Sequence, residues 1–128
     1  MIVKVTLPIY RKVRKKDVLV GLNQVSLLHR YTKNKWKQDY DKIVNDNMTR
    51  FMNEPYDGKY EIEYLLYYKN VRCDLGNVCC IAEKFALDSL QVLGVLKDDN
   101  VSRHVRSTYT VGGVDKENPR VEMTIKRI

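Results

Sequence analysis

The sequence predicts a single α+β domain, in which helices pack on one face of a mixed β-sheet. The chain has 128 residues, which suffices for one hydrophobic core and leaves little room for a second. Short segments that alternate apolar and polar residues lie near both ends of the chain, and segments with helical spacing lie between them. The expected order of elements is roughly β(β)αβαββ, with residues 1–128 forming one domain.

The first half of the chain is expected to contain one or two strands and a long helix. Residues 2–7 alternate apolar and polar side chains and stop at Pro8, as a strand would. Residues 18–22 form a short candidate second strand. From residue 24 to residue 51, apolar side chains recur near the period of an α-helix, and Asn34 and Asn45 leave a break open. Trp36 and the tyrosines are expected mainly in the core.

The second half is expected to contain three strands and one helix. Residues 60–68 are rich in β-branched and aromatic side chains, which favours a strand. Residues 78–93 predict a helix that ends at Gly94. Residues 101–111 and 120–127 alternate as two strands, and the glycine pair and the Asn-Pro pair between them predict a hairpin.

Positive charge is concentrated in the first half of the chain. The net charge is +7, and residues 1–50 hold twelve Lys or Arg against four Asp or Glu. This excess indicates a polyanionic partner, because cations neutralise phosphates and release counterions. The alternative is a surface that only keeps the protein soluble. The basic side chains expected to contact DNA phosphates are Arg11, Lys12, Arg14, Lys15, Lys16, Lys33, Lys35 and Lys37.

The composition disfavours a membrane protein and a zinc protein. No apolar run approaches the ~18 residues of a membrane span, so no membrane partner is expected. The first residues show no signal-peptide pattern, so a cytoplasmic location is expected. Cys73, Cys79 and Cys80 lack the paired spacing of zinc ligands, and we expect structural thiols in a reducing compartment.

The residues best suited to chemistry lie between positions 73 and 101. Asp74 precedes the predicted helix, and Asp98 and Asp99 follow it. Helix geometry alone would hold Asp74 and Asp99 about 24 Å apart, so they meet only if the chain returns to the start of the helix. Asn77, Lys84 and Asp88 fall within about 40° on the helix surface. The simplest interpretation of that stripe is a solvated face with a Lys84–Asp88 pair.

This segment resembles the RusA family of Holliday-junction resolvases. That family carries a D-x-D-N segment, a helix with Lys and F-x-x-D-x-L, a glycine and a D-D-x-V turn. The matching residues in this chain are Asp74, Asn77, Lys84, Phe85, Asp88, Leu90, Gly94, Asp98, Asp99 and Val101. A second similarity, to an L-N-x-x-x-x-x-H-R segment and a basic helix, covers Leu22-Asn23 through His29-Arg30 and the lysines that follow.

The resemblance implies a metal-dependent endodeoxyribonuclease that resolves branched DNA, in a bacterial cell or a phage-infected host. Its cofactor would be Mg²⁺, or Mn²⁺, held by Asp74, Asp99 and Asp98. Lys84 would be catalytic together with Asp74 and Asp99, with Asn77 and Asp88 in support. Asn77 would orient a carboxylate or cap the helix. Asn23 and Arg30 would join the basic residues that contact DNA, and a homodimer would match the symmetry of a four-way junction.

Gly76 departs from the family pattern, because the family has its second acid at this position. If the chain is extended before the helix, Asp74 and residue 76 would point to the same side. Glycine then leaves a missing metal ligand, or else serves a backbone with positive φ. Two alternatives to a nuclease therefore remain. One is a catalytically impaired protein that binds junctions or duplex DNA, and the other is a basic regulatory or assembly module.

Overall fold

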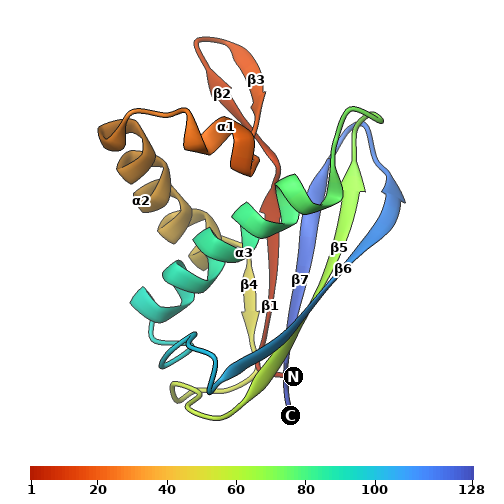
Figure 1. Ribbon diagram of the computed structural model, residues 1–128. Coiled ribbons are helices and arrows are strands. Elements are labelled where there is room, and N and C mark those ends of the chain that lie inside the picture. Colours follow the sequence, from red (N-terminus) through yellow and green to blue (C-terminus); the bar gives the residue numbers. More distant parts are fainter.

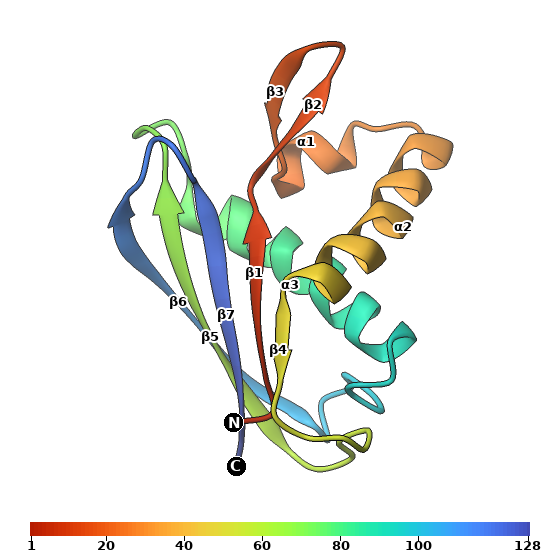
Figure 2. The same cartoon turned by 180° about the vertical axis from the view of Figure 1, so that it is seen from behind.

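The computed structural model describes residues 1–128 and confirms the predicted α+β class (Figure 1). A five-stranded mixed sheet has the order β4-β1-β7-β5-β6. The helices cover one face of this sheet, and the view from behind shows the other face uncovered (Figure 2). The bounds of these strands are β1 Val3–Pro8, β4 Met48–Arg50, β5 Tyr60–Tyr68, β6 His104–Val114 and β7 Arg120–Arg127.

The first long helix predicted from the sequence is wrong in its bounds, because the segment forms three elements. These are α1 Leu22–Ser26, α2 Arg30–Asp46 and the edge strand β4. The break arises at His29, which has extended backbone and accepts a hydrogen bond from the N–H of Tyr31 at the start of α2. Asn47 ends α2, and its side-chain amide donates to the carbonyl of Ile43. No helix in the molecule is both long enough and apolar enough to cross a membrane.

The connection through α3 Leu75–Val92 decides the pairing of the last two strands. α3 carries the chain back to the start of β5, so β6 runs parallel to β5 with Tyr60 beside His104 and Tyr68 beside Val114. β7 then inserts between β1 and β5, antiparallel to both. The predicted hairpin between the last two strands is therefore wrong: β6 and β7 lie on opposite sides of β5.

The core lies between the sheet and the two long helices. α3 buries Val78, Ala82, Phe85 and Ser89, the face that the helical spacing predicts. The ring of Tyr40 on α2 stacks on Phe85 at 4.8 Å between centroids, which joins the two helices. The other buried aromatic side chains are Trp36, Tyr60 and Tyr64, as expected for the core.

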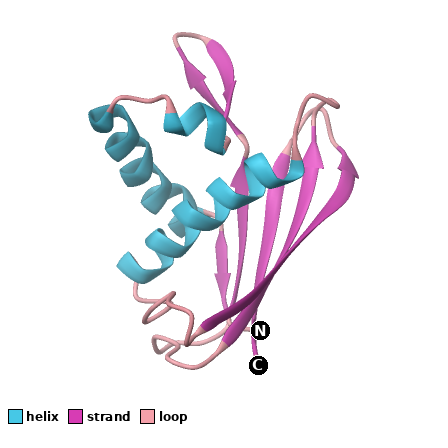
Figure 3. Cartoon of the chain, viewed as in Figure 1, coloured by secondary structure: helices cyan, strands magenta, loops and turns pink.

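A second, smaller sheet lies outside the main one. Strands β2 Tyr10–Val13 and β3 Lys16–Leu19 pair only with each other, and this hairpin projects from the body of the molecule beside α1 (Figure 3). The basic run predicted from the sequence belongs to this hairpin, together with Val18 and Leu19. The candidate second strand at residues 18–22 is therefore wrong in its bounds, because β3 starts at Lys16 and ends at Leu19, and Leu22 already begins α1. Its outer half is exposed, and its inner residues Val18 and Leu19 pack against the core.

Candidate nucleic-acid interface

The start of α3 is joined to the start of α1 by the side chain of Asn77. Its Oδ1 accepts the backbone N–H of Asn23 at 2.9 Å, and its Nδ2 donates to Gln24 Oε1 at 3.2 Å. The first N–H groups of a helix have no partner within the helix, so Asn77 caps α1 from a different helix. The prediction that Asn77 caps its own helix is wrong, because Asp74 occupies the N-cap position of α3.

Gly21 allows this close approach of the two helices. A β-carbon at Gly21 would overlap the side-chain amide of Asn77 and the side chain of Gln24. Sequence reasoning missed Gly21, and the only signal was a glycine directly before the Leu-Asn pair. The two segments that carry the family resemblance, 54 positions apart at Asn23 and Asn77, are therefore in direct contact.

A basic pocket of about 270 Å³ lies beside this joint. Its three lysines come from two helices: Lys33 and Lys37 from α2 and Lys84 from α3. The rest of the lining is mostly apolar. The other residues that line the pocket are Leu22, Val25, Ser26, Asn34, Ile81 and Phe85.

The charges in this pocket are only partly compensated. Lys37 Nζ lies 3.1 Å from Asp88 Oδ2, so the predicted Lys84–Asp88 pair along one helix turn is replaced by a pair between α2 and α3. Lys33 and Lys84 form no ion pair. The pocket therefore carries the uncompensated positive charge of Lys33 and Lys84.

The carboxylates that the family resemblance implies as metal ligands, those of Asp74, Asp98 and Asp99, do not lie together within one chain. Asp74 lies before the first residue of α3, whereas Asp98 and Asp99 follow its last, and the 18 residues of α3 rise about 27 Å. The hydroxyl of Tyr60 donates to the carbonyl of Asp98, which fixes the acidic turn beside the start of β5. The prediction that Asp74 and Asp99 reach one metal ion within a chain is therefore wrong.

The physical reason is the direction of the helix. α3 crosses the sheet obliquely, from the end of β5 toward the loop that leads to the start of β6, so its two ends lie far apart (Figure 1). No group of three or more His, Cys, Asp or Glu side chains is placed to hold a metal ion. The residues of a single chain therefore do not fit the three-carboxylate site that the resemblance implies.

Both carboxylate oxygens of Asp98 accept hydrogen bonds within its own turn. Its Oδ1 accepts the N–H of Asp99 at 2.7 Å, and its Oδ2 accepts the side-chain amide of Asn100 at 2.8 Å. Burial raises the pKa of the neighbouring Tyr60 hydroxyl, and the negative charges of Asp99 and Asp98 raise it further. Asp98 therefore has an ordinary structural role as an acceptor in a loop.

Gly76 lies within the first turn of α3 and not in an extended segment. The helix begins at Leu75, so the expected alternation of Asp74 and residue 76 on one side of an extended chain is wrong. Gly76 does not have a positive φ, and a β-carbon there would meet open space. The backbone explanation for this glycine is thereby excluded, and the missing-ligand explanation stays a prediction.

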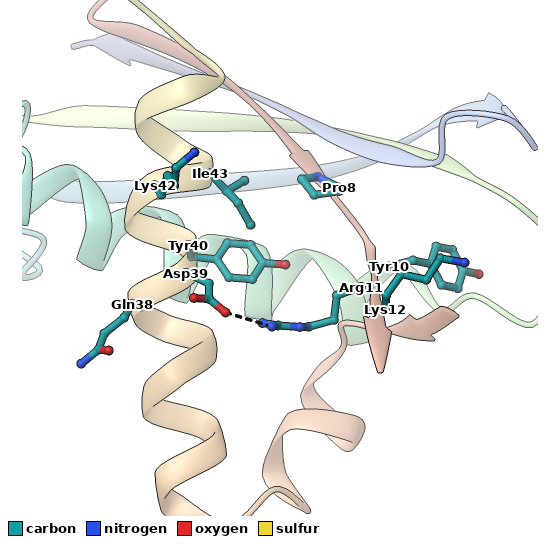
Figure 4. Close-up of a pocket in the computed structure, with 9 residues that line it drawn as sticks. All are labelled: Pro8, Tyr10, Arg11, Lys12, Gln38, Asp39, Tyr40, Lys42 and Ile43. Carbon is teal, nitrogen blue, oxygen red and sulfur yellow. Dashed lines mark hydrogen bonds and ion pairs between the residues drawn. The ribbon is translucent and has the colours of Figure 1, made fainter. Parts of the chain in front are cut away.

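The basic side chains near the base of the β2–β3 hairpin form ion pairs, whereas those at its tip do not. Arg11 donates to Asp39 at 2.9 Å and lies 4.4 Å over the ring of Trp36. Figure 4 shows Arg11 pointing toward Asp39 across a pocket of about 470 Å³ between the hairpin and α2, with Tyr40 beside it. Lys12 pairs with Asp17 at 2.9 Å. The other basic residues expected to contact DNA are exposed and without an acidic partner, namely Arg14, Lys15, Lys16, Arg30 and Lys35.

The structure thus brings together Asn23, Asn77 and the pocket lysines and separates the acidic residues. No protein-family model matches this chain, and no curated protein matches it in sequence.

Proposed function

We propose that the chain is a structure-selective endodeoxyribonuclease that acts on branched DNA, as RusA-type resolvases do. One observation carries the proposal: the two segments that resemble that family meet at the Asn23–Asn77 contact and form a basic pocket together. Lys33 and Lys84 would contact backbone phosphates there, and Lys84 would stabilise negative charge on a phosphate during cleavage. Neither lysine is needed for an internal ion pair, which supports a role toward a ligand.

The metal that this activity requires, Mg²⁺ or Mn²⁺, does not fit the carboxylates of one chain. A site that uses Asp74 and Asp99 together needs two chains, arranged so that the start of α3 in one approaches the end of α3 in the other. Two-fold symmetry supplies such an arrangement twice in a homodimer, and a four-way junction has matching two-fold symmetry. We therefore propose that the active form is a homodimer.

A second candidate is a protein that binds junctions or duplex DNA without cutting them. Two observations favour it: Gly76 stands where the family has an acid, and Asp74 lies a helix length away from Asp99. The basic pocket and the basic hairpin tip would serve binding equally well in this case.

The test is cleavage of a synthetic four-way junction with Mg²⁺ or Mn²⁺, beside binding to the same junction in EDTA. We expect symmetric nicks that are lost in Asp99→Asn and strongly reduced in Lys84→Ala, with binding of Asp99→Asn unchanged in EDTA. Asp46→Asn is the matched control, because Asp46 is an exposed acid on α2 that pairs only with Lys42. Tight binding without nicks would favour the second candidate. Neither binding nor nicks would overturn both and leave a basic regulatory or assembly module.

A further inference from the structure

The β2–β3 hairpin is built as a free ribbon. Its register runs from Tyr10 beside Leu19 to Val13 beside Lys16, and neither strand joins the main sheet. Both opposite views show it extending beyond the helices and the five-stranded sheet (Figures 1 and 2). Residues 12–17 are all exposed, so packing in the core does not explain the identity of the residues at its tip.

The turn of this ribbon holds two cations in an unfavourable backbone conformation. Arg14 has a φ of 50° and Lys15 a φ of 70°, and two successive positive values are typical of a type I′ turn. Asn-Gly is the preferred pair in such a turn, and a left-handed conformation is unfavourable for residues other than glycine, asparagine and aspartate. The turn itself therefore does not require Arg14 and Lys15, and an easier pair would close the same hairpin.

The uncompensated charge of the ribbon is also concentrated at this tip. Asp39 and Asp17 offset the charges nearer the base, on Arg11 and Lys12. Arg14, Lys15 and the adjacent Lys16 have no acidic partner, so the field at the tip is positive and faces solvent. A thin, positively charged ribbon suits a groove of a polyanionic duplex.

We propose that the tip of the β2–β3 hairpin enters a groove of a duplex arm of the DNA, where Arg14 and Lys15 contact phosphates. The major groove of B-DNA is about 12 Å wide and admits a two-stranded ribbon. This inference rests on the proposed binding of DNA, and it adds a second contact outside the basic pocket. The ribbon would hold one arm of a branched substrate while the pocket beside α1 holds the backbone nearer the joint of α1 and α3.

The double variant Arg14→Asn/Lys15→Gly tests the inference without damage to the fold. It removes both cations and installs the residues that a type I′ turn prefers, so the melting temperature should stay the same or rise. The affinity for a duplex oligonucleotide is measured in EDTA over a range of salt concentrations. We expect the slope of log affinity against log salt to flatten by about 1.8, since each phosphate contact contributes about 0.9.

The matched control is Lys59→Gln/Lys97→Gln, which removes the same charge from exposed lysines that form no ion pair and lie near the start of β5 and beyond the end of α3. Its slope should not change. If the hairpin variant keeps the wild-type slope, or if both double variants flatten it equally, the groove contact is overturned while DNA binding stands. If the wild-type chain binds no DNA at all, the proposed function fails together with this inference.

Discussion

Gly76 occupies the second residue of α3, where nothing within 4 Å would obstruct a side chain. Glycine weakens a helix by about 0.5–1 kcal/mol relative to alanine, and an acid in the first turn gains about 0.3–1 kcal/mol from the helix dipole. Gly76→Asp should therefore raise the free energy of unfolding by about 0.5–1 kcal/mol. Urea unfolding followed by circular dichroism measures this change, and a lower stability would contradict the open environment at this position.

The same substitution tests whether glycine replaces a metal ligand. An added carboxylate two residues after Asp74 should lower the metal concentration that gives half-maximal nicking of a junction. Gly76→Asn is the control, because it adds a similar side chain without the charge. A stable Gly76→Asp protein with the metal requirement of the wild type would contradict the missing-ligand explanation.

The thiol of Cys79 is buried, and its burial makes it unreactive. Burial raises the pKa of its thiol to about 12, with smaller contributions from Cys73, Cys80 and Glu83. The thiolate is the form that reacts with iodoacetamide, and little thiolate exists at pH 8 when the pKa is this high. We expect Cys79 to stay unlabelled in the native protein at pH 8 and to be labelled in denaturant, as mass spectrometry of its peptide reports. Rapid native labelling would contradict the burial of this thiol.

At the scale of elements, the hydrogen bonds between α1 and α3 come from a single side chain, that of Asn77. Asn77→Ala removes the acceptor for the N–H of Asn23 and should lower the free energy of unfolding by about 1 kcal/mol, as loss of a helix cap does. Gly21→Ala should also destabilise the protein, because its new methyl group displaces the Asn77 side chain. Urea unfolding of both variants measures the two costs.

The double variant Gly21→Ala/Asn77→Ala tests whether the two substitutions affect the same contact. With Asn77 already truncated, the methyl group at position 21 has less to displace, so Gly21→Ala should cost less in the Asn77→Ala background. Strictly additive costs would show that Gly21 and Asn77 act independently.

Local patterns predicted some elements well. The strands at 60–68 and 120–127 have the bounds expected from the sequence, because residue type in the first and alternation in the second are local properties. The predicted pairing of the last two strands failed, because the crossover through α3 decides it and no local signal encodes that choice. The long helix failed at His29, where the backbone turns so that α1 can contact α3.

In the candidate site too, residue types could be predicted from the sequence, whereas contacts between distant positions could not. The sequence identified Asn77, Lys84 and the lysines of the basic helix by their residue type and order. It could not show that Asn23 and Asn77 touch, since that contact joins positions 54 residues apart. It also favoured a meeting of Asp74 and Asp99 that the direction of α3 prevents within one chain.

In the whole molecule, the basic hairpin and the acidic turn lie at opposite ends of the β5–α3–β6 unit (Figure 1). The basic hairpin, α1 and the start of α3 lie at one end, whereas the acidic turn after α3 and both chain termini lie at the other (Figure 1). The acidic turn that holds Asp99 is therefore remote from the basic hairpin and from the start of α3 (Figure 1). If Asp99 takes part in cleavage, a second chain must therefore bring it there.

Mixed dimers test this directly. Asp74→Asn and Asp99→Asn should each abolish nicking of a four-way junction. In a dimer with one chain of each kind, a site built from two chains would lose both carboxylates on one side of the two-fold axis and keep both on the other. We expect co-expressed, doubly tagged mixed dimers to recover nicking of one strand only. The control pairs Asp74→Asn with Asp74→Asn/Asp99→Asn, which leaves no intact site in any dimer. A site contained within one chain predicts no recovery in either mixture, because every chain then lacks one of its two acids.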